Sequence, residues 1–291
     1  MLLKLIKAVI RFVRWVISIS VTLVLIAAGI YIYARYIEPE LLIIKEEKLV
    51  TQSISIPKDT LKIVQFSDVH LGEDFTITDL KRVVERINGL KPDLIIFTGD
   101  LIDDNKGFTE VEEASVLLGQ LQATYGKFAV YGNHDHGGNG TKRYAKILAA
   151  AEFKLLVNDN QYVTLENGER IHLIGIDDKL LGTVNIEKAM EGIQKSNYNL
   201  FISHAPDVAD EVTGYPIDLQ LSGHSHGGQV RIPFVGAPFT PPYANKYIKG
   251  KYTFEENERM VLYVNSGIGT SQVRYRLGNI PEITCFLISN S

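Results

Sequence analysis

The sequence is poor in cysteine and has no excess of basic residues. Cys285 is the only cysteine among 291 residues, so the chain can form neither an internal disulfide nor a thiolate zinc site. Any bound metal must be held by nitrogen and oxygen. The 30 Lys and Arg against 34 Asp and Glu give a formal net charge of −4, so nucleic acid is not an expected partner. With 45% hydrophobic residues, the chain can bury a full core.

Charged residues are absent from Trp15 to Ala34. As a helix this run is about 30 Å long, which matches the hydrocarbon core of a bilayer. We therefore expect a transmembrane helix over 15–34, preceded by a basic cytoplasmic segment over 1–14. The positive-inside rule then predicts a single-pass protein of the cell membrane whose remaining chain lies outside the cytoplasm. The alternatives are a cleaved signal peptide, and thus a soluble protein, or a buried helix.

After an expected connector over 35–48, no linker-like stretch interrupts the chain, which predicts one domain over 49–291. Short apolar runs predict strands over 61–66, 94–97, 127–131, 171–176, 200–203, 219–221, 261–264 and 283–288. Helical periodicity predicts helices over 78–90, 110–122, 141–151 and 186–195. The first half is therefore a βαβαβ series and the second half is mixed. Two facing sheets covered by helices satisfy this α/β pattern.

Unusual polar residues follow the predicted strands. In chain order these segments are Ser67-Asp68-Val69-His70, Gly99-Asp100, Gly132-Asn133-His134-Asp135, Ser203-His204-Ala205-Pro206 and Gly223-His224-Ser225-His226-Gly227-Gly228. Because ligands in α/β folds sit at the carboxyl ends of strands, we expect these side chains to converge in one pocket. A set of imidazole, carboxylate and carboxamide ligands without thiolate suits Mn, Fe, Zn or Co. Two such cations need a shared ligand, for which Asp100 is the obvious candidate.

These segments resemble the calcineurin-like metallophosphoesterase family, whose pattern D-x-H, G-D, G-N-H-[DE], H and G-H-x-H they match in order. The resemblance covers about Leu61 to Gly228. It implies a four-layer α/β/β/α metallophosphoesterase sandwich, here with an N-terminal transmembrane helix. It also implies that two divalent metal ions, with Mn²⁺ the first expectation, are held by two sets of three residues and a bridge. The implied sets are Asp68, His70 and His226 for one metal, Asn133, His204 and His224 for the other, and Asp100 between them.

The chemistry of such a centre is attack of a metal-activated hydroxide on phosphorus. We expect His134, which the resemblance leaves free of metal, to protonate the leaving group as general acid. Asp135 is predicted either to orient His134 and raise its pKa or to make a purely structural hydrogen bond. His136 and His172 lie outside the pattern and are interpreted as ordinary polar residues.

The segments 223–230 and 232–238 resemble a membrane-associated bacterial branch of the family that includes YkuE-like and YaeI-like phosphoesterases and some UDP-2,3-diacylglucosamine pyrophosphatases. Arg231, Arg274 and Arg276 are expected either to contact phosphate or to be ordinary surface arginines. The proline-rich loop between Phe234 and Tyr247 is expected either to form a rim for substrate or to pack on the domain.

The sequence thus predicts a metal-dependent phosphoesterase that hydrolyses a phosphodiester or pyrophosphate bond, with a phosphoester substrate that is lipid-linked or part of the cell envelope. The alternative from another class is a catalytically inactive scaffold or receptor that retains the fold and the metal. No ligand or acid of the pattern is missing, which favours the enzyme. The sequence gives no indication of the oligomeric state.

Overall fold

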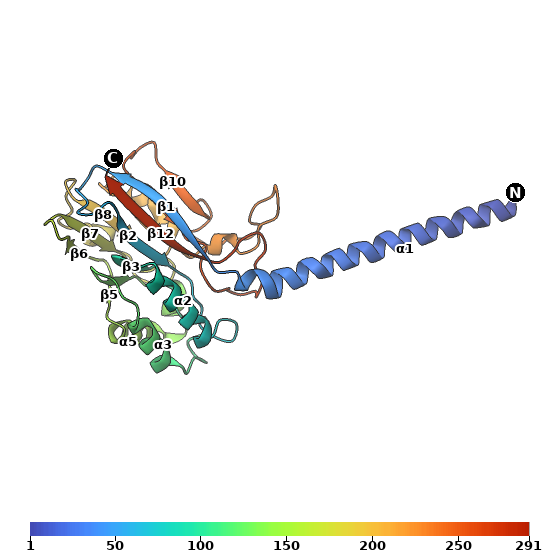
Figure 1. Cartoon of the computed structure of the whole chain (residues 1–291), viewed down its shortest axis with the longest axis horizontal. Coiled ribbons are helices and arrows are strands. Elements are labelled where there is room, and N and C mark those ends of the chain that lie inside the picture. The colour runs from blue at the N-terminus through green and yellow to red at the C-terminus, as the bar shows by residue number, and fades with distance from the viewer. Residues whose placement is uncertain (291) are drawn as a thin grey trace.

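A long helix, α1 (Leu2–Ile32), projects as a single rod from the rest of the chain in the computed structural model, which describes residues 1–290 (Figure 1). Over this described length α1 has no buried residue. The helix is long and apolar enough to cross a membrane, in agreement with the span expected over 15–34. It also includes most of the basic segment that precedes the expected span.

Two short helical turns join α1 to the folded domain. They are the π-helical turn Tyr33–Ile37 and the 3-10 turn Glu38–Glu40. The buried Glu38 carboxylate accepts hydrogen bonds from the backbone N–H groups of Gly278, at 3.0 Å, and of Asn279. These bonds fix the domain end of the helix to a loop near the C-terminus of the chain.

Over residues 1–290, two mixed six-stranded sheets form the domain. The first has the order β1-β12-β2-β3-β4-β5, with bounds Ile43–Thr51, Glu282–Asn290, Leu61–Phe66, Leu94–Phe97, Lys127–Ala129 and Phe153–Leu155. The second has the order β10-β11-β9-β8-β7-β6, with bounds Gly250–Thr253, Val261–Val264, Leu219–Ser222, Tyr198–Ile202, Arg170–Gly175 and Asp159–Thr164. Strands β2 to β5 are parallel, as are β7, β8, β9 and β11.

The alternation of side chains along β3 shows how the layers pack. Ile95 and Phe97 belong to the apolar core shared with α2 (Ile77–Gly89), α3 (Val111–Gly119) and α5 (Thr141–Ala150). Leu94 and Ile96 point the other way, into a core shared with the second sheet. A third core lies between the second sheet and the short helices α6 (Ile186–Ala189) and α7 (Ala209–Val212). These cores confirm the four-layer α/β/β/α class.

The structure corrects two of the expected boundaries. Strand β1 begins at Ile43, so the first sheet reaches into the range 35–48 that was expected to be a connector. This edge strand carries charged residues and pairs in parallel with β12, which explains why an apolar run did not reveal it. The helix expected over 186–195 is the single turn α6, which ends at Ala189, and Gly192 in the following turn has a φ of +73°, which is not helical.

Candidate metal centre and active site

Each expected site residue follows the carboxyl end of a strand. Some of these strands belong to the first sheet and the others to the second. Asp68 and His70 follow β2, Asp100 follows β3, and the one-turn helix α4 (Asn133–His136) follows β4. His204 follows β8, and His224 and His226 follow β9. Asp68, His70, Asp100, His204, His224 and His226 are buried, whereas Asn133 and His134 are partly exposed. The fold therefore gathers these residues at one edge.

Five of these residues adopt a left-handed backbone conformation, with φ between 48° and 67°: Asp68, His70, Asp100, His224 and His226. Non-glycine residues rarely adopt positive φ, and such strain concentrates at functional sites. The neighbouring glycine at 223 is needed for space, because a Cβ there would collide with the side chains of Ser67 and Asp68. The strained backbone conformations therefore occur at residues whose side chains turn into the site.

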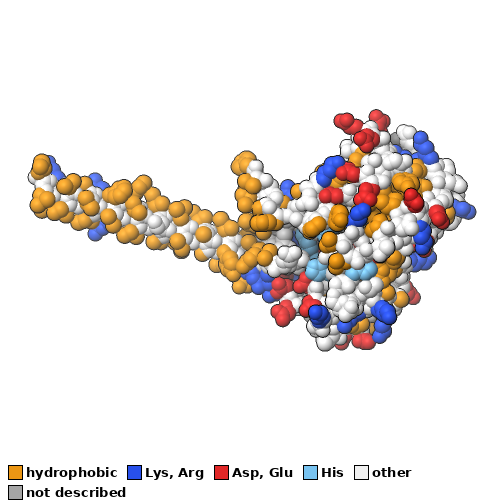
Figure 2. All heavy atoms as spheres, turned by 180° about the vertical axis from the view of Figure 1, so that it is seen from behind, with side chains coloured by type: hydrophobic (Ala, Val, Ile, Leu, Met, Phe, Trp, Pro, Cys, Tyr) orange, Lys and Arg blue, Asp and Glu red, His pale blue; other side chains and the backbone are white. Residues whose placement is uncertain are grey.

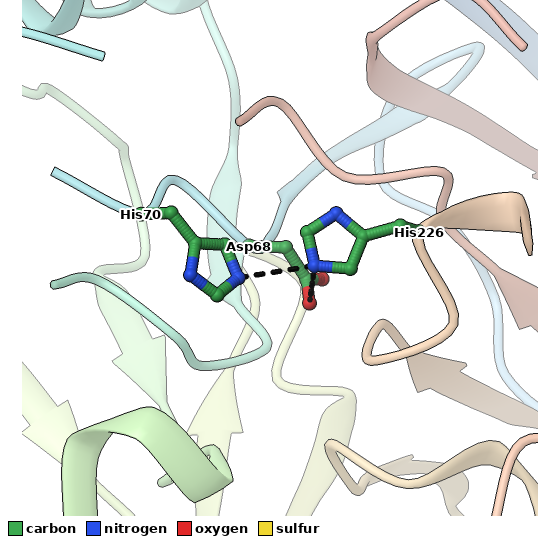
Figure 3. A group of neighbouring side chains, drawn as sticks. All are labelled: Asp68, His70 and His226. Carbon is green, nitrogen blue, oxygen red and sulfur yellow. Dashed lines mark hydrogen bonds and ion pairs between the residues drawn. The ribbon is translucent and has the colours of Figure 1, made fainter. Parts of the chain in front are cut away.

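Asp68, His70 and His226 form one group of three potential metal ligands (Figure 3). Nε2 of His226 lies 3.4 Å from Oδ1 of Asp68 and 3.0 Å from Nε2 of His70. The two rings turn these nitrogens toward each other above the carboxylate (Figure 3). The group comes from the ends of β2 and β9, one in each sheet.

Asp100, His204 and His224 form a second group. Nε2 of His204 lies 3.2 Å from Oδ2 of Asp100 and 3.1 Å from Nδ1 of His224. The same Oδ2 of Asp100 lies 3.6 Å from Nε2 of His70, which belongs to the first group. Asp100 therefore connects the two groups, as a bridging carboxylate would.

Hydrogen bonds to backbone carbonyls assign the protons on two of the rings. Nδ1–H of His204 donates to the carbonyl oxygen of Thr98 at 2.7 Å, and Nε2–H of His224 donates to that of Pro242 at 2.8 Å. When both rings are neutral, as metal ligands must be, the nitrogens without a proton are the ones that face each other at 3.1 Å. Two lone pairs that converge in this way repel unless a cation lies between them, and this arrangement of ring partners is typical of metal-binding histidines.

The side-chain oxygen of Asn133 supplies an independent indication of a cation site. It is buried and has no hydrogen-bond partner among residues 1–290. A buried carboxamide oxygen without a partner is costly. A cation coordinated by this oxygen removes the cost, so the donors present fit two divalent ions bound by nitrogen and oxygen.

Burial and neighbouring charges set the protonation of the site. Burial raises the pKa of Asp100, but His204 and His70 outweigh it and hold the pKa of this carboxyl well below its usual range. Burial, His70 and the buried Arg276 lower the pKa of His226 well below that of free histidine. An ionised Asp100 and a neutral His226 are the states that bind metal.

His134 stands at the edge of the site with its ring partly exposed. Its backbone N–H donates to Oδ1 of Asp100 at 2.8 Å, and its Nδ1–H donates to the carbonyl oxygen of Asp103 at 2.8 Å. Nε2 is left facing outward, 3.5 Å from Oγ of Ser271. Burial lowers the pKa of His134, but the charge of Asp100 and the bond to Asp103 outweigh burial and raise it.

Asp135 does not take the position that a partner of the His134 ring would occupy. Its carboxylate accepts three backbone N–H groups, from Asp100 at 2.8 Å, Leu101 at 3.0 Å and Gly132 at 2.8 Å. Burial and the nearby Asp100 raise its pKa to about 7. The structural alternative therefore describes its hydrogen bonds, and we correct the expectation that Asp135 directly orients the ring of His134. Its charge nevertheless contributes to raising the pKa of His134, as expected.

Asp103 is a site residue that the sequence reasoning missed. Its Oδ1 lies 3.2 Å from Nδ1 of His70 and 3.6 Å from Nδ1 of His134. The hydrogen bond with His70 lowers the pKa of this half-exposed carboxyl. The sequence could have indicated Asp103 as a site residue by its position, because it lies three residues after Asp100 and beyond the end of β3.

The three arginines differ from one another in their surroundings. Arg276 is fully buried and donates to the carbonyl oxygens of Ser266 and Gly269, so it is not free to bind phosphate. Arg274 pairs with Asp74 on the surface. Arg231 donates to the carbonyl oxygen of Gly227 at 3.1 Å and remains partly exposed.

A pocket of about 430 Å³ opens over the expected metal ligands. Its lining includes His134, His224 and His226 on one side and Pro238, Phe239, Pro241 and Pro242 from the proline-rich loop on the other. The loop thus forms part of the rim, while its buried Tyr247 packs on the domain. Figure 2 shows histidine side chains in a hollow on this face of the molecule.

A fold of two facing sheets with clustered aspartates and histidines at their strand ends defines a class of metal-dependent phosphoesterases. The family model described as calcineurin-like phosphoesterase matches residues 61–228, more than half of the chain. The chain therefore belongs to the calcineurin-like phosphoesterase family. It is a hydrolase that acts on phosphoester bonds, and its family uses a binuclear centre of divalent metals.

Among its relatives, the chain is 40% identical over 267 residues to the uncharacterized metallophosphoesterase YkuE of Bacillus subtilis, covering 92% of each chain. It is 29% identical to the UDP-2,3-diacylglucosamine pyrophosphatase LpxG of Chlamydia trachomatis, covering 94% of this chain and 97% of the relative. It is also 29% identical to the phosphodiesterase YaeI of Escherichia coli, covering 87% of this chain and 90% of the relative. These relatives confirm the resemblance to the membrane-associated bacterial branch.

Proposed function

We propose that this enzyme hydrolyses a phosphodiester or pyrophosphate bond in a lipid or another cell-envelope molecule, at the outer surface of the cell membrane. The observation that carries the catalytic part is the position of Asp100. One of its oxygens lies 3.2 Å from a nitrogen of His204 and 3.6 Å from a nitrogen of His70, so one carboxylate serves both groups of ligands.

The proposed ligands follow from these two groups. Asp68, His70 and His226 hold one divalent cation, and Asn133, His204 and His224 hold the other, with Asp100 shared. Mn²⁺ is the first candidate, and Fe, Zn and Co suit the same donors. When bound, such cations activate water and neutralise charge on the phosphoryl oxygens. The protein fixes the orientation of the His204 and His224 rings through their hydrogen bonds to the carbonyls of Thr98 and Pro242.

His134 is the proposed general acid. Its Nδ1 proton is engaged by the carbonyl oxygen of Asp103, which leaves Nε2 as the atom that delivers a proton toward the pocket. The hydrogen bond to Asp103 supports this role, because it favours the protonated ring and an acid must carry its proton near neutral pH. The leaving oxygen takes that proton as its bond to phosphorus breaks.

The proposed topology is a single membrane span by α1, with the N-terminus in the cytoplasm and the catalytic domain outside. The basic residues before the apolar run support this orientation. The contacts of the domain end of α1 support retention of the helix, because the carbonyl of Ala34 accepts from the N–H of Arg276 at 2.9 Å. Mass spectrometry of the protein extracted from membranes should find the intact N-terminus, and a mature N-terminus beyond residue 34 would overturn the anchor.

The substrate class is supported by the anchor and by the LpxG relative, whose name specifies a lipid-linked nucleotide sugar. A catalytic domain outside the cytoplasm would not meet a cytoplasmic UDP-lipid. We therefore favour an envelope lipid with an exposed phosphodiester or pyrophosphate over a cytoplasmic nucleotide sugar. A screen of phospholipids, lipid-linked nucleotide sugars and cyclic nucleotides with added Mn²⁺ would separate these classes.

The catalytic part is tested with the full-length protein in detergent, bis(p-nitrophenyl) phosphate and added Mn²⁺. Asp100→Ala and His224→Ala should each lower turnover by about 10³-fold or more, because Lewis-acid stabilisation worth several kcal/mol is lost. Asp59→Ala, which removes an exposed carboxylate between β1 and β2, is the matched control and should retain turnover. Undiminished turnover in either site variant would refute the proposal. Metal binding without turnover in the wild type would indicate the inactive scaffold.

A further inference from the structure

The segment Ile232–Pro242 is an uncharged apolar loop whose largest side chains face solvent. Phe234, Val235 and Phe239 are 110%, 70% and 85% exposed. Two hydrogen bonds of 2.9 Å between Ile232 and Gly236 close a tight turn near whose tip Phe234 holds a φ of +66°. A bulky residue in this conformation is strained, and a Phe or Val side chain left in water does not gain the free energy of burial. The turn thus exposes apolar side chains that no other part of residues 1–290 covers.

The base of this loop is linked to the domain end of α1. The N–H of Arg231 donates to the carbonyl oxygen of Leu277 at 2.7 Å. Two residues before Leu277, the ring of Tyr275 lies 5.6 Å from the ring of Tyr31, centroid to centroid. Tyr31 lies near the end of the apolar run of α1, where aromatic rings prefer the headgroup level of a membrane. These contacts therefore link the base of the loop to the part of α1 that we expect at the headgroup level.

The same loop forms a wall of the catalytic pocket. Phe239 lines that pocket together with His134 and His226, and so does the half-exposed Val273. The side chain of Gln229, three residues before the loop, donates to the carbonyl oxygen of Val273 at 2.6 Å. Figure 2 shows hydrophobic side chains on a lobe that projects beside the domain end of α1, with histidines in a hollow close to it.

From this continuity we infer that the loop Ile232–Pro242 inserts into the lipid bilayer beside α1. The bilayer is the occupant that fits an uncharged, apolar surface adjoining an apolar helix. Insertion would hold the pocket mouth at the lipid surface, so that a headgroup phosphate could enter it without leaving the leaflet. This inference rests on the membrane anchoring under the proposed function and adds a second contact with the membrane.

The test is fluorescence quenching with the full-length protein in nanodiscs of phosphatidylcholine and phosphatidylglycerol. In a Cys285→Ser background, single cysteines replace Val235, Val50 or Val24 and carry an environment-sensitive dye. The three valines are matched, at 70%, 66% and 66% exposed. Val24 lies in α1, and Val50 lies in β1 close to the end of the strand farthest from the helix (Figure 1). The quencher is a nitroxide on the lipid acyl chain.

We expect the dyes at 235 and 24 to be quenched to a comparable extent and the dye at 50 to remain unquenched. Equal, weak quenching at 235 and 50 would overturn the inference. So would a blue-shifted dye at 235 that lipid nitroxides do not quench, since a second copy or another protein would then cover the loop. Absence of quenching at 24 would overturn it as well, by removing the anchor.

Turnover of bis(p-nitrophenyl) phosphate by the same labelled proteins separates this inference from the proposed activity. Turnover without quenching at 235 means that the loop does not insert although the enzyme is active. Quenching without turnover supports insertion while the proposed reaction fails. The paired change Phe234→Ser and Val235→Ser, which lies outside the pocket lining, should leave turnover of this soluble substrate unchanged within about twofold.

Discussion

The carboxylate of Asp103 lies 3.2 Å from Nδ1 of His70, on the side of the ring opposite the nitrogen that faces His226. This contact selects the tautomer in which Nδ1 carries the proton and Nε2 is free to bind metal. The same carboxylate lies 3.6 Å from Nδ1 of His134. One exposed aspartate thus adjoins both a proposed ligand and the proposed acid.

The first prediction concerns Asp103. We expect Asp103→Ala to weaken metal binding by about 10–100-fold, as loss of a partner that orients a histidine ligand typically does. Asp103→Asn, which keeps an acceptor oxygen, should lose less. Chelator competition with Mn²⁺ measures both. The control is Asp104→Ala, whose carboxylate accepts from the backbone of Lys106 instead of a ring. Equal affinities of Asp103→Ala and Asp104→Ala would show that Asp103 has no positioning role.

The second prediction tests His134 as an acid. His134→Gln should lower turnover of an alkyl phosphodiester by about 10²–10⁴-fold, because a poor leaving group needs a proton. Turnover of bis(p-nitrophenyl) phosphate should fall far less, since its leaving group departs as a stable anion. His136→Gln is the control, because that ring pairs with Asp177, 2.8 Å away. A loss that is equal for both substrates would assign His134 to binding or structure.

The third prediction concerns the junction between α1 and the domain. The backbone N–H groups of Gly278 and Asn279 each donate to a different oxygen of Glu38. Glu38→Gln replaces one of these oxygens with an NH2 group, which cannot accept, so one of the two N–H groups loses its acceptor. Because the group is buried, we expect a loss of about 1–3 kcal/mol of stability, seen as a lower Tm. The exposed Glu40, which pairs with Arg82, gives the control Glu40→Gln, for which less than about 1 kcal/mol is expected. Similar Tm values for the two variants would contradict the structural role of Glu38.

The inner strands and the residue types of the site could be predicted from the sequence. Strands β2, β3 and β11 have the expected bounds, because buried parallel strands are continuous apolar runs such as Leu94–Phe97. The edge strands were not predicted, because they are not continuous apolar runs. Of these, β1 alternates exposed and partly buried residues, and its place beside β12 depends on a pairing between distant parts of the chain.

The contacts between residues within the site were harder to predict from the sequence. The motif containing Asp135 predicted a carboxylate near the site but not the direction in which that side chain points. The carboxylate accepts backbone N–H groups and does not face the ring of His134. The carbonyls of Thr98 and Pro242 leave no signature in the side-chain sequence, although they orient His204 and His224. Such contacts depend on backbone positions that only the folded chain defines.

The fourth prediction uses a histidine outside the metal centre. His172 is buried in β7, where its ring stacks on Tyr162 and its Nε2–H donates to Oδ1 of Asn160 at 2.6 Å. Its Nδ1 has no hydrogen-bond partner among residues 1–290. Burial lowers the pKa of His172 to about 4, compared with about 6.5 for an unfolded chain.

Between these two pKa values the unfolded chain binds a proton that the folded chain does not, so the stability contributed by neutral His172 falls as the pH drops from about 6.5 to 4. The contribution is at most about 3 kcal/mol, and it is fully present above pH 6.5. We expect the Tm of the wild type to approach that of His172→Gln over this range, because glutamine does not titrate. Taking the difference between the two proteins cancels the titration of the metal ligands. A Tm difference that stays constant from pH 7 to about 4 would show that His172 is protonated in the folded protein as readily as in the unfolded chain.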